Sequence, residues 1–147
     1  EKALQKYSNE MKAKYTADID GGKTPEETID LFIEALKHGD IEKASKYYVL
    51  EKQEEELAHL REDILGKYGD LQKSIDFYSR IKNKGVKKCN EKMDGCAFDY
   101  VYTETATTTY EVVGMNQKII VPAGEKTTES IDVGLNYYSN VWKIELP

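Results

Sequence analysis

The feature that most constrains the fold is a change in the spacing of apolar residues at Gly85. Before this glycine, apolar side chains recur every three or four residues, which is the period of an amphipathic helix. After it, they alternate with polar residues, and Tyr, Thr and Val predominate, as is typical of strands. Helices followed by antiparallel strands predict an α+β domain, with the N-terminal helices packed on one side of a curved antiparallel sheet.

The helical half has clear start signals. Thr24 is expected to be an N-cap, Pro25 takes the first helical position, and Glu27 completes a capping box. Asp40 is expected to cap the next helix, whose buried side includes Tyr47 and Tyr48. The periodicity predicts helices over residues 1–20, 25–38, 41–48, 51–68 and 71–82.

The alternating half predicts strands near 86–91, 96–105, 108–114, 117–121, 127–138 and 141–146, although 96–113 could form one long, bent strand. Phe98, Tyr100 and Tyr102 share one face of their strand, as do Trp142, Ile144 and Leu146 in the last one. The expected organisation is an amphipathic helix or stalk over 1–22 and a single domain over 23–147. The stripe Leu4, Tyr7, Met11 and Tyr15 leaves three roles open for the first helix: docking on the domain, forming a stalk, or pairing in a homodimer.

Cys89 and Cys96 flank an Asp94-Gly95 turn signal, so paired strands would place the two cysteines directly opposite each other. We therefore expect a disulfide, with two free thiols as the alternative. The chain starts at Glu1 without a methionine or an apolar signal segment, so it is either a trimmed piece or a chain whose leader was removed. The cysteine pair favours the second interpretation and an extracytoplasmic location, either secreted or anchored on the outer side of the cytoplasmic membrane.

Charge and composition argue against several classes of function. The net charge is −6, and Arg61 and Arg80 are the only arginines, so we expect no nucleic-acid partner. Apolar runs stay far below the ~20 residues that span a bilayer, which leaves only an N-terminal anchor outside this sequence as a route to the membrane. A metal site needs about four ligands close together, and His38 and His59 lie in predicted helices far from the two cysteines, so we expect no metal and no cofactor.

The candidate site residues are aromatic. Tyrosine combines an apolar body with a polar tip, which suits pocket mouths and interfaces, although it also suits half-exposed sheets. The candidate ligand-binding residues are Tyr47, Tyr48, Phe98, Tyr100, Tyr102 and Trp142. Asp99 is the weak catalytic candidate: it could be a pocket base if its face is concave, but it is exposed if the aromatic face points inward.

Two segments resemble a known family. Residues 24–44, with a capped helix, Phe32, Ala35-Leu36 and Gly39-Asp40, resemble the opening of nuclear transport factor 2-like domains, and residues 141–146, with Trp142-Lys143-Ile144, are similar to their last strand. The resemblance covers roughly 24–146 and is closest to exported or lipid-anchored bacterial members of unassigned role. It implies a cone-shaped half-barrel that often encloses a pocket and hosts both acid–base enzymes and binding modules.

Three hypotheses for function follow. The first is an extracytoplasmic, non-catalytic module that binds a small ligand or a protein partner. The second is an isomerase- or hydratase-like acid–base enzyme that uses Asp99 with neighbouring tyrosines. The third is a structural spacer domain on a membrane-anchored stalk.

Overall fold

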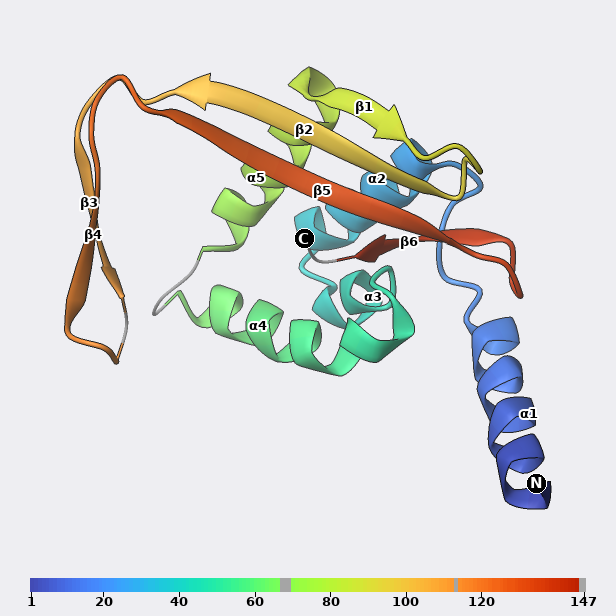
Figure 1. Ribbon diagram of the computed structural model, residues 1–147. Coiled ribbons are helices and arrows are strands. Elements are labelled where there is room, and N and C mark those ends of the chain that lie inside the picture. Colours follow the sequence, from blue (N-terminus) through green and yellow to red (C-terminus); the bar gives the residue numbers. More distant parts are fainter. Residues whose placement is uncertain (67–69, 113, 146–147) are drawn as a thin grey trace.

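The computed structural model describes residues 1–66, 70–112 and 114–145. It is an α+β structure in which helices from the first half pack on one side of a curved antiparallel sheet from the second half (Figure 1). The helices are α1 (Lys2–Ala17), α2 (Pro25–Lys37), α3 (Ile41–Ser45), the short 3-10 helix η1 (Leu50–Lys52), α4 (Gln53–Leu65) and α5 (Leu71–Lys84). The fold class predicted from the change of period at Gly85 is therefore confirmed.

The strands are β1 (Val86–Cys89), β2 (Gly95–Thr103), β3 (Thr108–Val112), β4 (Gln117–Val121), β5 (Lys126–Asn136) and β6 (Val141–Glu145). The main sheet has the order β1-β2-β5-β6, and β3 and β4 form a separate two-stranded sheet. The alternative of one long strand over 96–113 is wrong, because β2 ends at Thr103 and β3 belongs to the second sheet. Figure 1 shows the β3–β4 hairpin turning away from the far end of β2 and β5.

The core lies between the main sheet and helices α2 and α5, which contact β6 and the β2–β5 pair respectively. Register decides which side chains enter it. Phe98 pairs with Ile131 and Cys96 with Val133, and these four side chains face the helices and are buried. Because side chains alternate across a strand, Asp99, Asp132 and Gly134 lie on the opposite face of the sheet.

The segment that follows α3 pairs with the edge of β6 that does not face β5. Tyr48 forms a parallel bridge with Ile144, the Ile144 amide donates to the Tyr47 carbonyl over 2.8 Å, and the Val49 amide donates to the Ile144 carbonyl over 2.9 Å. The prediction of a helix through Tyr48 is therefore wrong. The helix ends at Ser45 because these backbone groups pair with the sheet edge instead.

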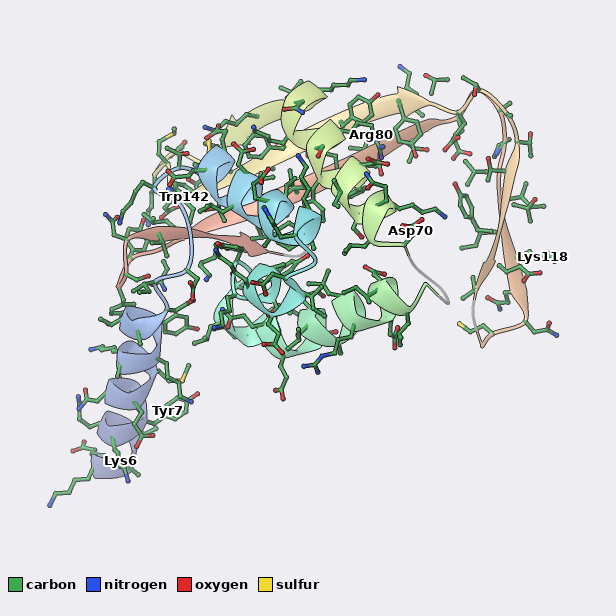
Figure 2. All side chains as sticks on the ribbon, turned by 180° about the vertical axis from the view of Figure 1, so that it is seen from behind. Lys6, Tyr7, Asp70, Arg80, Lys118 and Trp142 are labelled. Atoms are coloured by element: carbon green, nitrogen blue, oxygen red, sulfur yellow. A yellow bond between two sulfur atoms is a disulfide. The ribbon has the colours of Figure 1, made fainter. Side chains whose placement is uncertain are left out.

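Helix α1 stands apart from the other helices and has no buried residue, and Figure 2 shows Lys6 and Tyr7 projecting from it. Its C-terminal end is tied to the domain: Tyr15 stacks on Tyr138 with ring centroids 6.1 Å apart, and Asn136 donates to the Tyr15 carbonyl over 2.9 Å. Leu146 and the predicted end of the fourth helix at Tyr68 lie outside the described residues.

Candidate functional site

Four of the predicted ligand-binding residues are core residues. Tyr47, Tyr48, Phe98 and Trp142 are each less than 10% exposed and pack in one apolar cluster. Trp142 lies on β6, and its backbone amide donates to the Gly22 carbonyl over 2.9 Å (Figure 2). The space between helices and sheet is thus filled by side chains here, and ligand binding by these four residues stays a prediction.

Tyr48 has a polar partner inside this cluster. Its hydroxyl lies 2.7 Å from the hydroxyl of Tyr78 on α5, and the Phe32 ring packs against both tyrosines. Burial raises the pKa of both phenols, that of Tyr78 to about 12. One hydrogen bond thus gives each of the two hydroxyls a partner, so both tyrosines contribute to the structure of the core.

Tyr100 and Tyr102 lie on the helix-facing side of β2, toward the end that leads to the β3–β4 hairpin. Their rings stack with centroids 5.8 Å apart. The Arg80 guanidinium lies 5.8 Å from the Tyr100 ring centroid and donates to Glu129 over 2.8 Å (Figure 2). Both rings are only half-buried, so this is a stacked aromatic surface rather than a pocket.

Asp99 faces away from the helices, on the outer side of the sheet. It lies opposite Ser130 in the β2–β5 register, and the Ser130 hydroxyl donates to its Oδ1. The structure therefore does not bring Asp99 together with Tyr100 or Tyr102, which face the other side. Its catalytic role stays a prediction that no contact of this carboxylate supports.

The disulfide predicted from the turn sequence is confirmed. Cys89 and Cys96 are bonded, and they are directly opposite each other in the β1–β2 register. In the turn between them, Asn90 Oδ1 accepts hydrogen bonds from the Asp94 and Gly95 amides. The pairing follows from the local turn, as the sequence indicated.

A cavity of about 250 Å³ opens where the C-terminal end of α1, η1 and the β5–β6 hairpin meet. Of the residues that give it chemical character, only Tyr15 was named in the sequence analysis, as part of the apolar stripe of the first helix and not as a site residue. These residues are Tyr15 and Asp18 from the end of α1, Glu51 from η1, Tyr138 from the β5–β6 turn, and Lys143 and Glu145 from β6. The volume lies below the range of pockets for drug-sized ligands, so it suits a small molecule or a single side chain.

The floor of this cavity is a buried ion pair. The Lys143 side chain is 3% exposed, and its ammonium donates to Asp18 Oδ1 over 2.8 Å, to the Asp20 carbonyl over 2.6 Å and to the Lys46 carbonyl. Its three donors are therefore all used. Burial lowers the pKa of the ammonium, while the Asp18 carboxylate opposes this effect.

Asp18 retains an unused acceptor. Its side chain is 6% exposed, and Oδ2 has no hydrogen-bond partner among the described residues, although Oδ1 is bonded to Lys143. A buried carboxylate oxygen without a donor is costly. Asp18 also belongs to the lining of the cavity.

Glu145 adds a negative charge that has no ion-pair partner among the described residues. It lies directly opposite Asp132 in the β5–β6 register, an arrangement of like charges that destabilises a strand pair. Its carboxylate lies over the Gly134 backbone, where a Cβ would collide with Oε1. Partial desolvation raises the pKa of Glu145, although the residue is exposed, and the carboxylates of Asp132 and Glu51 raise it further.

The lysine that could neutralise Glu145 is engaged elsewhere, because Lys143 directs its ammonium to Asp18 and two carbonyls. Beside these charges, the stacked rings of Tyr15 and Tyr138 supply an aromatic wall, and aromatic faces attract cations. The described part of the chain holds no group of three His, Cys, Asp or Glu side chains arranged for a metal ion.

On β6, Lys143 and Glu145 alternate with the core residues Trp142 and Ile144, a pattern that by itself indicates the solvent-facing side of a strand. Among the described residues, no helix is both long enough and apolar enough to cross a membrane. No protein-family model, curated protein or solved structure matches this chain.

Proposed function

We propose that the protein is an extracytoplasmic, non-catalytic binding module that holds a small organic ammonium ion in the cavity between α1, η1 and the β5–β6 hairpin. The observation that carries this proposal is the buried Oδ2 of Asp18, which has no partner among the described residues and belongs to a residue lining a cavity with an excess of carboxylates. Asp18, Glu51 and Glu145 carry three negative charges, and Lys143 carries one positive charge, so the lining has a net charge of −2.

The proposed ligand follows from these groups. An ammonium N–H would give Asp18 Oδ2 its missing donor, and its charge would relieve the repulsion that raises the pKa of Glu145. The Tyr15 and Tyr138 rings would hold the carbon body of the ligand. An anion would meet the same carboxylates and be repelled.

Two further observations support an extracytoplasmic binding module. The disulfide is typical of proteins that fold outside the reducing cytosol. The resemblance to nuclear transport factor 2-like domains implies a fold that hosts non-enzymatic binding modules, and a filled interior directs the search for a site to the outer side of the sheet.

The test is a titration followed by backbone-amide NMR shifts, with 2-phenylethylammonium as the probe. Its neutral isostere 2-phenylethanol and the anion 3-phenylpropionate are the matched controls. We expect the ammonium to shift the amides of Asn136, Tyr138 and Glu145 and to bind about tenfold more tightly than the alcohol. Equal binding of ammonium and alcohol, or shifts elsewhere only, would refute the proposal.

A variant pair ties binding to the cavity. Glu145→Gln should weaken ammonium binding about tenfold, because it removes a charge from the lining. Asp99→Asn removes a carboxylate from the same face of the sheet without touching the cavity lining, so it should bind like the wild type. If Asp99→Asn weakened binding as much as Glu145→Gln, overall negative charge rather than this site would attract the probe.

A further inference from the structure

The β3–β4 hairpin is an arm with little support from the rest of the domain. Its strands Thr108–Val112 and Gln117–Val121 pair only with each other and continue from the point where the β2–β5 ladder ends at Thr103 and Lys126. Figure 1 shows the arm bending at the far end of β2 and β5 and running down on the side of the sheet where the helices lie. An isolated two-stranded hairpin is marginally stable in water, so something else is expected to support this one.

The arm is also unusually apolar for an exposed segment. Tyr110 is 51% exposed, Ile119 54% and Ile120 65%, and Ile119 and Ile120 lie on opposite faces because side chains alternate along β4. Each strand of the hairpin has one edge without a partner strand. An exposed edge rich in β-branched residues is a template for pairing with another chain.

The charge distribution favours a second copy of this chain as the partner. The whole protein has a net charge of −6, whereas the arm carries only Glu111 and Lys118, which lie opposite each other and sum to zero. The arm is therefore a neutral surface on an acidic protein, where two copies can meet without like-charge repulsion.

We propose that the arm joins two copies of this chain by antiparallel pairing of β4 with β4 of the second copy. Pairing centred on Ile119 puts Ile119 opposite its own copy, Lys118 opposite Ile120, and Gln117 opposite Val121, so no like charges are opposed. The result is a four-stranded sheet with two-fold symmetry. The outer edge of β3 stays free in this arrangement.

The first test is sedimentation velocity over a concentration series. The wild-type mass should rise from monomer to dimer with concentration, and the double variant Ile119→Lys/Ile120→Lys should stay monomeric. Met115→Lys adds a charge to the exposed tip outside β4 and should dimerise like the wild type. Since these side chains are exposed, all three proteins should have the same far-UV circular dichroism. A wild type that stays monomeric at every concentration overturns the proposal.

The second test depends on geometry rather than on disruption. With the native disulfide intact, Ile119→Cys should form a covalent dimer under mild oxidation, whereas Thr109→Cys, one strand away from the symmetry axis, should not. Equal cross-linking of both variants overturns the proposed pairing. So does a monomeric wild type that instead binds vesicles of phosphatidylcholine and phosphatidylglycerol through Ile119 and Ile120, which would make the arm a lipid contact.

Discussion

The ammonium of Lys143 lies 2.8 Å from Oδ1 of Asp18, a residue 125 positions earlier in the chain. This buried contact fastens the end of α1 to β6, and it forms the floor of the cavity. Segment 18–22 therefore packs on the domain, although the sequence-based division placed it in the N-terminal helix or stalk. This ion pair therefore connects the segment that follows α1 to the last strand of the described chain.

Asp18→Asn should destabilise the protein by about 3 kcal/mol at neutral pH, because it leaves a buried ammonium without its counter-charge. The loss should shrink as the pH rises. Burial already holds the pKa of Lys143 below its usual value, so the folded protein sheds this proton before the unfolded chain does, and deprotonation removes the penalty. Urea unfolding at neutral and alkaline pH measures both effects. A loss that grew with pH would contradict this role for Asp18.

Truncation separates the exposed part of α1 from its anchored end. Removal of residues 1–13 should leave the midpoint of thermal unfolding unchanged, since α1 buries no side chain. Removal of residues 1–20 should lower this midpoint markedly. The Asp18 carboxylate and the Asp20 carbonyl are then lost, and the buried Lys143 ammonium is left without these two acceptors. Similar melting of both truncated proteins would show that the ion pair does not stabilise the fold.

Local rules predicted much of the fold, because they act within a few residues. Thr24 Oγ accepts from the Glu27 amide over 3.1 Å, and Asp40 Oδ1 accepts from the Lys43 amide over 3.1 Å, as the capping patterns indicated. Alternation placed Phe98, Tyr100 and Tyr102 on one face of their strand, and in the register of β2 with β5 this is the helix-facing side. The misplaced end of α3 at Tyr47 and Tyr48 has a long-range cause, since these residues pair with β6 at the other end of the sequence.

The cavity escaped prediction for the same reason. A strand with Trp142 and Ile144 on one face predicts solvent on the other, and nothing near Lys143 in the sequence shows that segment 18–22 covers it. The tyrosine content indicated aromatic binding surfaces. It did not show that the Tyr48 hydroxyl is hydrogen-bonded to that of Tyr78, or that the rings of Tyr15 and Tyr138 stack. Long-range packing, rather than residue type, separates core tyrosines from cavity tyrosines.

The disulfide should contribute to stability through the unfolded state. Replacing Cys89 and Cys96 together by serine should cost about 2–3 kcal/mol, since the crosslink limits the freedom of the unfolded chain. Denaturant unfolding of the variant, and of wild type with and without reductant, provides the measurement. The reduced wild type should match the variant, and unchanged stability in both would contradict this contribution.

The Tyr48–Tyr78 pair is testable by a double-mutant cycle. Tyr48→Phe and Tyr78→Phe should each cost about 1–2 kcal/mol, because each leaves a buried hydroxyl without its partner. The double variant should lose less than the sum of the two, since the orphaned group is then gone as well. Additive losses would show that the hydroxyls find other partners.

Glu145 offers the sharpest separation of a binding role from a structural one. Its raised pKa means that the folded protein holds this proton more tightly than the unfolded chain, so ionisation costs stability as the pH rises through the raised value. Glu145→Gln should therefore match the wild type in stability near pH 4 and exceed it modestly at pH 7. The exposed Glu62→Gln is the matched control and should match the wild type at both pH values.

Thermal unfolding measures these stabilities. In the same scans, 2-phenylethylammonium should stabilise the wild type more than Glu145→Gln. A Glu145→Gln protein that is less stable at pH 7 would make Glu145 a structural residue, whereas a gain in stability with a loss of ligand response is the outcome expected of a binding residue.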